Sequence, residues 1–249
     1  MATVSFNDND TEVQIAAQAA GQGAPANAPI TVRPPQPVSP RSYVEDEDVT
    51  GEFGTDDMAM PRINVVQRVG DLADHFPPGT ILLNKEIVLG DSANPVEVVA
   101  LRIKKQYQEM VPFGSDAEAR VFDTAAEVVA NGGQVSNYDG PHYFGPLATI
   151  LFLVKMPKSV APHLSAFFPY KCGEDNYAIA VFTAARSAYT GVAFKLVEQK
   201  RATGSVRGVL WKFQSVLTKR NSNTWFKPTL APLGVPSDDF ANYIATLPL

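Results

Sequence analysis

Short apolar stretches of strand length, each closed by proline, glycine or asparagine, decide which folds this chain of 249 residues can adopt. The clearest are Val96–Tyr107, which is rich in β-branched residues, and Leu147–Met156, a continuous apolar run typical of a buried strand. Few segments have helical periodicity, and strands and helices do not alternate along the chain. The pattern predicts a mainly β fold, α+β overall, built as a barrel or a sandwich with a few short helices.

Several further elements follow from the same reasoning. Three segments predict short helices: Asp123–Ala130, Ala185–Lys200 and Ser237–Leu247. In the last of them Ser237 is expected to be the N-cap. The alternating stretch Met60–Gln67 predicts the first strand of the folded part.

The first 59 residues differ from the rest in composition. Residues 1–60 contain ten carboxylates and two basic groups, a local balance of −8, together with a proline-rich stretch from Pro29 to Pro40. Such a segment buries too little apolar surface to offset the entropy lost on ordering, so we expect 1–59 to be a disordered, acidic tail. Its role is a solubilising linker, an acidic mimic that competes for a basic surface, or a docking segment for a partner. Residues 60–249 are then one domain.

Positive charge gathers near the other end of the chain. Residues 186–227 hold nine basic groups and one acid, Glu198, a local balance of +8. The aromatic side chains among them are Tyr189, Phe194, Trp211, Phe213, Trp225 and Phe226. Cations follow phosphates and aromatic faces stack on unpaired bases, so the mixture indicates a groove for single-stranded nucleic acid. The alternative is a basic hairpin on an ordinary domain.

A β-hairpin is predicted inside this stretch, with strands Val209–Thr218 and Thr224–Thr229 around a polar turn, residues 219–223. Alternation places Trp211 and Phe213 on one face, and Trp225 with Lys227 opposite Phe226. Two readings stay open for Trp211 and Phe213: they stack on bases, or they belong to the core. We expect Tyr189 and Phe194 to be core residues.

A second basic and aromatic set lies on the strand Val96–Tyr107, where Val99, Leu101 and Ile103 are expected to point one way and Arg102 and Lys104 the other. The predicted nucleic-acid-binding residues are Arg102, Lys104, Lys105, Tyr107, Arg207, Trp211, Lys212, Phe213, Lys219, Arg220, Trp225, Phe226 and Lys227. A basic rim is expected from Arg186, Lys195, Lys200, Arg201 and Arg207.

The sequence gives no support for catalysis. Phosphate-binding glycine loops are absent, and the three histidines have neither the spacing of metal ligands nor nucleophilic partners. The single cysteine, Cys172, excludes an internal disulfide framework. With no apolar run long enough to span a bilayer and no secretory signal, we expect an intracellular protein that is not an enzyme and needs no cofactor or metal.

Two stretches carry a resemblance to a known family. The opening MPRINVVQ (Met60–Gln67), with Pro78-Gly79-Thr80 and VEVVALRIKKQY after it, and the closing hairpin FQSVLTKRNSNTWFKPTL (Phe213–Leu230) resemble single-stranded DNA-binding proteins of tailed bacteriophages. The resemblance covers about residues 60–230. It implies an OB-type barrel and sequence-independent binding of single strands in phage replication or recombination, in the host cytoplasm.

The resemblance also bears on partners. Proteins of this class often carry an acidic C-terminal tail for partner proteins, whereas the acidic segment here is N-terminal. The implied partners are single-stranded DNA, replication or recombination proteins through the acidic tail, and further copies of the chain in a homo-oligomer. A different class of function, a phage structural or assembly protein that uses the N-terminal arm for subunit contacts, is the alternative.

Overall fold

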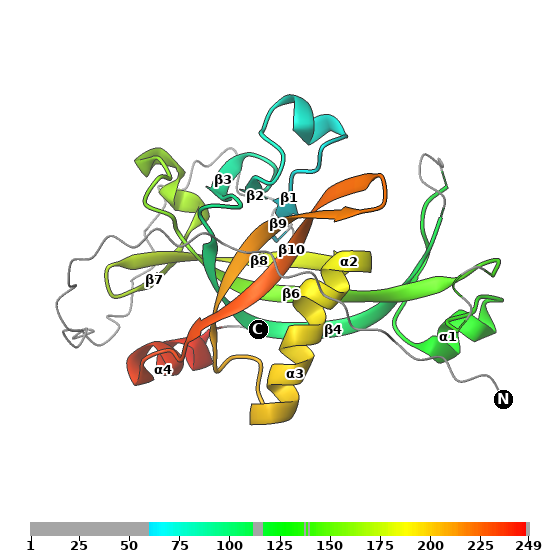
Figure 1. The fold of residues 1–249 in the computed structure, drawn as a ribbon. Coiled ribbons are helices and arrows are strands. Elements are labelled where there is room, and N and C mark those ends of the chain that lie inside the picture. The colour runs from blue at the N-terminus through cyan, green and yellow to red at the C-terminus, as the bar shows by residue number, and fades with distance from the viewer. Residues whose placement is uncertain (1–59, 112–116, 137, 139, 248–249) are drawn as a thin grey trace, which may run out of the picture. The chain divides into compact units, whose positions relative to one another are not determined.

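The computed structural model describes residues 60–111, 117–136, 138 and 140–247. The disordered tail predicted for residues 1–59 therefore lies outside the described residues. The described part is mostly β, with antiparallel sheets and few helices, which confirms the mainly β prediction (Figure 1). No helix in this part of the chain is long and apolar enough to cross a membrane.

The strands form two antiparallel sheets. In chain order they are β1 (Ile63–Val65), β2 (Ile81–Leu83), β3 (Ile87–Gly90), β4 (Val96–Glu109), β5 (Val121–Phe122), β6 (Phe144–Lys155), β7 (Tyr170–Cys172), β8 (Asp175–Ala185), β9 (Leu210–Arg220) and β10 (Asn223–Gly234). The larger sheet has the order β10–β9–β4–β6–β8–β7, with β5 beside the far end of β4. The smaller sheet has the order β1–β2–β3. The strands predicted at Val96–Tyr107 and Leu147–Met156 are confirmed as β4 and β6.

The helical segments cover fewer residues. They are η2 (Asp71–Asp74), α1 (Ala125–Ala130), η3 (Pro162–Phe167), α2 (Arg186–Ala188), η4 (Tyr189–Ala193), α3 (Phe194–Thr203) and α4 (Asp238–Thr246). The three predicted helices are present, and the Ser237 hydroxyl accepts the Phe240 N–H at the start of α4 as expected. The middle one is continuous from α2 to α3 but contains the π-helical turn η4. It ends at Gly204, whose φ of +79° is the left-handed conformation that glycine adopts easily.

The two sheets are joined by a backbone bridge along one edge and by side-chain hydrogen bonds at the opposite edge. Before β1, Arg62 forms a parallel bridge with Val181 of β8. On the far side, the Gln67 side chain bonds both the N–H and the C=O of Phe226 in β10. In the described residues no strand pairing closes the circle, so the predicted barrel is not closed.

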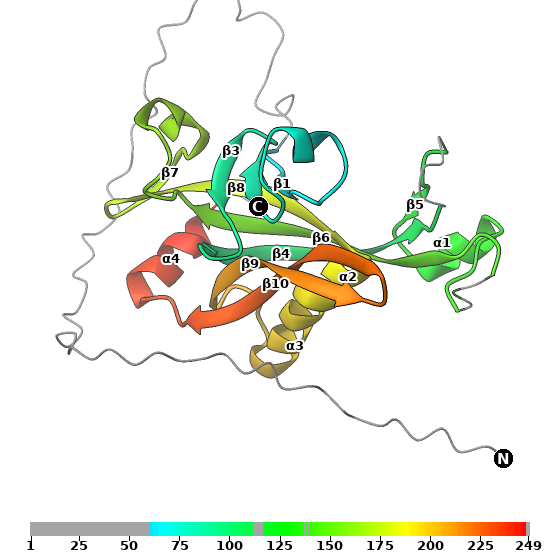
Figure 2. The ribbon, with the colours of Figure 1, turned by 45° about the horizontal axis from the view of Figure 1, so that its top comes forward.

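Two apolar clusters lie on the two faces of the larger sheet. The larger cluster fills the space between this sheet, the smaller sheet and the α2–α3 segment, and Phe152, Phe182 and Phe213 meet at its centre. Figure 2 shows β1 and β3 on one side of β4, β6 and β8, and α4 at the edge of these strands. On the opposite face, Phe240 and Ile244 of α4 cover Val99 and other strand residues. A sheet with both faces covered explains why β6 is apolar without interruption.

A β-bulge divides β4 into two halves. Pairing with β6 runs from Val98 to Ala100 and resumes at Arg102, which leaves Leu101 as an extra residue. Because side chains alternate along a strand, the extra residue exchanges the two faces beyond it. Ile103 therefore lies opposite Ile150 on the face of the larger cluster.

Candidate nucleic-acid interface

The predicted hairpin is confirmed, with a tighter turn than expected. β9 and β10 pair without interruption from Arg220 and Asn223 back to Trp211 and Pro232, so the turn has only two central residues. The first of these, Asn221, has a φ of +55°, which asparagine tolerates better than most residues. The hairpin forms the last two strands of the larger sheet and is paired with β4 only at its base; in Figure 1 it passes in front of β6 and β8.

Trp211 and Phe213 belong to the core. Their exposed fractions are 5 % and 0 %, and both lie in the larger apolar cluster. Their partners on β4 are Val98 and Val96, which face the same cluster. The stacking role considered for these two side chains is therefore wrong for this structure, because neither ring presents a face to solvent. Burial of large aromatic side chains decides between the two readings.

The second tryptophan has a different environment. The Trp225 indole N–H donates to the Ser187 hydroxyl of α2 at 3.1 Å, and the ring is only partly buried. Lys227, on the same face of β10, lies beside Gly191 of η4. Phe226 points the other way and packs on Gly79, which confirms the predicted alternation. The face that carries Trp225 and Lys227 is thus the one turned toward the helical segment.

Glycine at position 191 allows this close approach. A side-chain carbon at Gly191 would collide with the Pro228 carbonyl oxygen of β10. The π-helical turn that contains Gly191 widens the helix at this point, a feature often found at functional sites. The helix and the hairpin therefore come together through backbone contact.

Lys105 and Tyr107 form a second part of the interface. The Lys105 ammonium lies 4.8 Å from the centre of the Tyr107 ring. A hydrogen bond with the Tyr107 hydroxyl raises the pKa of Lys105, and the Tyr189 hydroxyl of η4 adds to the effect. Tyr189 also packs against the edge of the core, as predicted.

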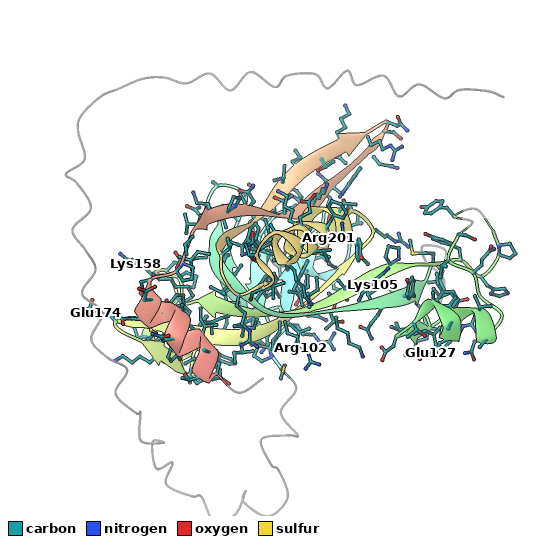
Figure 3. The ribbon with its side chains drawn as sticks, turned by 90° about the horizontal axis from the view of Figure 1, so that it is seen from below. Arg102, Lys105, Glu127, Lys158, Glu174 and Arg201 are labelled. Carbon is teal, nitrogen blue, oxygen red and sulfur yellow. The ribbon has the colours of Figure 1, made fainter. Side chains whose placement is uncertain are left out.

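Side-chain alternation separates Arg102 and Lys104 from this group, and the bulge at Leu101 decides which face each pair takes. Arg102 and Lys104 lie on the face of β4 opposite to Lys105, so the expected single basic set is split in two (Figure 3). Lys104 is also engaged already, since its ammonium lies 2.7 Å from the Asp123 carboxylate. Arg102 is exposed and keeps its charge available. The expectation that Ile103 points away from Arg102 and Lys104 is confirmed. The expectation that Val99 and Leu101 point the same way as Ile103 is wrong, because the bulge places them in the apolar cluster on the opposite face.

Other predicted residues lie apart from Trp225. Arg207 donates through Nε to the Leu101 carbonyl at 3.1 Å, which fixes it at the bulge. Lys212 lies on the far face of β9 from Trp211, opposite Glu97. Lys195 donates to the Leu230 carbonyl. Phe194, which was expected in the core, is 50 % exposed on α3, so that prediction is wrong.

The basic side chains of this region differ from those elsewhere in their ion pairing. Within the described part of the chain, none of the nine basic side chains of residues 186–227 forms an ion pair, whereas Lys104, Arg120 and Lys155 elsewhere do. Arg186 has the added feature of a φ of +52° at the junction of β8 and α2. A non-glycine residue in this conformation costs roughly 1 kcal/mol or more. Arg186, a cation in a strained backbone conformation, is thus the direct neighbour of Ser187, whose hydroxyl accepts the Trp225 N–H.

The candidate interface accordingly keeps six of the predicted residues and adds Arg186 and Tyr189. We call this set the hairpin surface, and its members are Lys105, Tyr107, Arg186, Tyr189, Lys219, Arg220, Trp225 and Lys227. Arg186 was expected only as part of a rim, and Tyr189 only as core. The role of Ser187 in holding Trp225 has no signal in the sequence, because it depends on contact between segments 38 residues apart.

The described residues show no group of three histidine, cysteine, aspartate or glutamate side chains that could hold a metal ion. Comparison of the chain with protein-family profiles, with curated proteins and with solved structures found no match. The chemistry of the hairpin surface is therefore the basis for a functional proposal.

Proposed function

We propose that this protein binds single-stranded DNA without sequence preference and acts in bacteriophage replication or recombination. The observation that supports this most directly is the position of Trp225, a partly exposed indole fixed at its nitrogen by Ser187 and set among unpaired cations. A ring held at one edge is ready to stack on an unpaired base, at low cost in side-chain entropy. Cations without carboxylate partners are free to neutralise phosphates.

The hairpin surface has a continuous order that suits a strand of nucleic acid. Lys105 lies on the same face of β4 as Ile103, which packs against the larger cluster as Tyr189 of η4 does. Ser187 joins this helical segment to Trp225 through its hydroxyl. Beyond Trp225, the exposed Lys219 and Arg220 extend the positive charge to the end of the hairpin. Aromatic rings then alternate with cations, which is the arrangement expected for binding backbone and bases together.

An OB-type barrel is the finer fold that we propose. It is supported by the parallel bridge between Arg62, just before β1, and Val181 of β8. The Gln67–Phe226 hydrogen bonds also support it, because they join the segment after β1 to the last strand. The OB-fold is itself a partly open barrel, so incomplete pairing at one seam agrees with the proposal.

A fluorescence titration tests the DNA-binding proposal. Because Trp211 is buried and Trp225 is partly exposed, quenching by an oligo-dT strand should come from Trp225 alone. The variant Trp211→Phe should keep the quenching, and Trp225→Phe should lose it. The midpoint should move to higher DNA concentration when salt is raised.

Two results would overturn the proposal. The first is unchanged emission together with no mobility shift of the oligonucleotide. The second is quenching that survives in Trp225→Phe, since it would place the bound strand elsewhere. A large closed assembly without DNA in sedimentation would favour the structural or assembly role.

A further inference from the structure

The sheet edge of β4 is open between its two neighbours. β9 pairs with β4 only as far as Val99, and β5 begins to pair at Tyr107. Between these points β4 keeps its partner β6 on one side, while no strand of the described residues pairs with it on the other. We call the stretch from Ile103 to Lys105 the open edge of β4.

The pairing pattern shows which backbone groups point outward there. The N–H of Glu109 bonds the Arg120 carbonyl, on the side of β5. Groups on one side of a strand recur at every second residue, so those of Tyr107, Lys105 and Ile103 point the same way. Tyr107 lies opposite Pro146, a residue with no N–H to donate, which agrees with this assignment.

Charge flanks the open edge on both faces. Arg102 lies on one face and Lys105 on the other, and both are exposed and free of ion pairs in the described structure (Figure 3). Arg207 stands at the end of the edge, where it bonds the Leu101 carbonyl. Pairing of this edge with the same edge of a second copy would bring like charges face to face, which is unfavourable. The suitable occupant is an extended segment with carboxylates on both faces.

The chain itself contains such a segment. In Val44–Val49 four acidic residues follow one another, Glu45, Asp46, Glu47 and Asp48. Extended, this segment presents Glu45 and Glu47 on one face and Asp46 and Asp48 on the other. We propose that Val44–Val49 binds as an added strand along the open edge of β4 in the same molecule. Backbone hydrogen bonds to Ile103 and Lys105 and ion pairs with Arg102 and Lys105 hold it there.

The intervening chain is long enough for this arrangement. Asp48 is 13 residues before Pro61, whose carbonyl accepts the Val181 N–H of β8. At about 3.3 Å per residue, 13 residues reach roughly 43 Å. β4 is two strands from β8, and strands are about 4.8 Å apart, so the open edge lies within that reach.

Amide hydrogen exchange of the full chain, followed by NMR, tests the proposal without DNA and so independently of the proposed function. The test variant carries Glu45→Gln, Asp46→Asn, Glu47→Gln and Asp48→Asn. The control variant removes the same number of charges elsewhere, with Asp8→Asn, Asp10→Asn, Glu12→Gln and Asp57→Asn. The Lys104 amide, directed at β6, reports on an intact sheet.

We expect the amides of Ile103 and Lys105 to exchange about tenfold faster in the test variant than in the wild type, with the control variant unchanged. High salt should produce the same acceleration in the wild type. Equal rates in all three proteins would overturn the proposal, as would changes confined to other amides. Protection that rises with protein concentration would also overturn it, because the segment would then come from a second copy.

Discussion

The Trp225 indole N–H donates to the Ser187 hydroxyl at 3.1 Å, so a strand of the hairpin and the start of a helix share one aromatic side chain. Neither segment would hold the ring by itself, since β10 leaves it on the sheet surface. The contact couples the proposed stacking residue to Arg186, its neighbour in α2.

Trp225→Ala should weaken binding of single-stranded DNA by about 1–3 kcal/mol, the value of one stacked base. Ser187→Ala should have a smaller effect in the same direction, because the ring remains but loses its fixed orientation. Neither change removes a charge, so the salt dependence of the affinity should stay the same. Fluorescence anisotropy at several salt concentrations measures both quantities. An altered salt slope in Trp225→Ala would contradict the assignment of this residue to stacking.

Lys219→Ala and Arg220→Ala should each lower the salt slope by about 0.7, the value for one phosphate contact with a single strand. Both side chains are exposed at the end of the hairpin. Lys171→Ala, an exposed cation on β7, is the matched control and should leave the slope unchanged. If all three variants behave alike, the end of the hairpin does not contact phosphates.

Phe213→Ala should destabilise the fold by about 3–5 kcal/mol, because it empties the centre of the larger cluster between Phe152 and Phe182. Phe194→Ala, at a half-exposed ring, should change the free energy of unfolding by about 0.5 kcal/mol or less. Urea denaturation measures both values. A small loss in Phe213→Ala would contradict the central position of this ring.

At acidic pH the free energy of unfolding should depend on the protonation of Glu109. Hydrogen bonds from Arg120 at 2.8 and 2.9 Å hold the pKa of the Glu109 carboxyl at about 2, below its ordinary 4.5. Because the folded state has the lower pKa, this stabilisation is complete above pH 4.5 and is lost as the pH falls toward about 2. The free energy of unfolding between pH 5 and pH 2 should therefore fall less steeply in Glu109→Gln. Glu118→Gln, at an exposed neighbouring acid, should follow the wild type.

Neutralising Glu45, Asp46, Glu47 and Asp48 should tighten DNA binding, most of all at low salt. The reason is that Lys105 belongs both to the hairpin surface and to the open edge of β4, so the acidic segment and DNA compete for it. Titration of an oligo-dT strand at low and high salt measures the difference, which screening should abolish at high salt. Unchanged affinity at low salt would mean that the two ligands occupy separate cations.

Local patterns in the sequence predicted most of the elements correctly. Apolar runs and caps are properties of neighbouring residues, so the strand at Leu147–Met156 and the Ser237 cap could be inferred directly. Which hairpin residues are buried was harder to predict, because Trp211 and Trp225 differ only in what packs against them. Trp211 meets β4 and the core, whereas Trp225 meets Ser187, a residue whose approach depends on Gly191 and the π-helical turn.

The candidate nucleic-acid interface also depends on features that one sequence does not reveal. Strict alternation along Val96–Tyr107 could not reveal the extra residue at Leu101, because a bulge has no reliable signature in one sequence. Alternation by itself places Arg102 and Lys104 on the face opposite Lys105 and Tyr107, but which of these faces meets the larger cluster depends on the bulge. Phe194 was predicted to be buried because phenylalanine is usually a core residue, but its position on α3 leaves the ring half exposed.

The bulge at Leu101 shifts the side-chain alternation of β4 by one residue, so the two halves of the strand are out of phase. Before Leu101, the face of β4 that meets the larger cluster carries Val96 and Val98. After Leu101, the same face carries Lys105 and Tyr107. Deleting one residue there would rotate the rest of the strand by half a turn and move Lys105 to the outer side, away from Tyr189. A single unpaired residue thereby decides which face of the sheet carries Lys105 and Tyr107 and which carries Arg102 and Lys104.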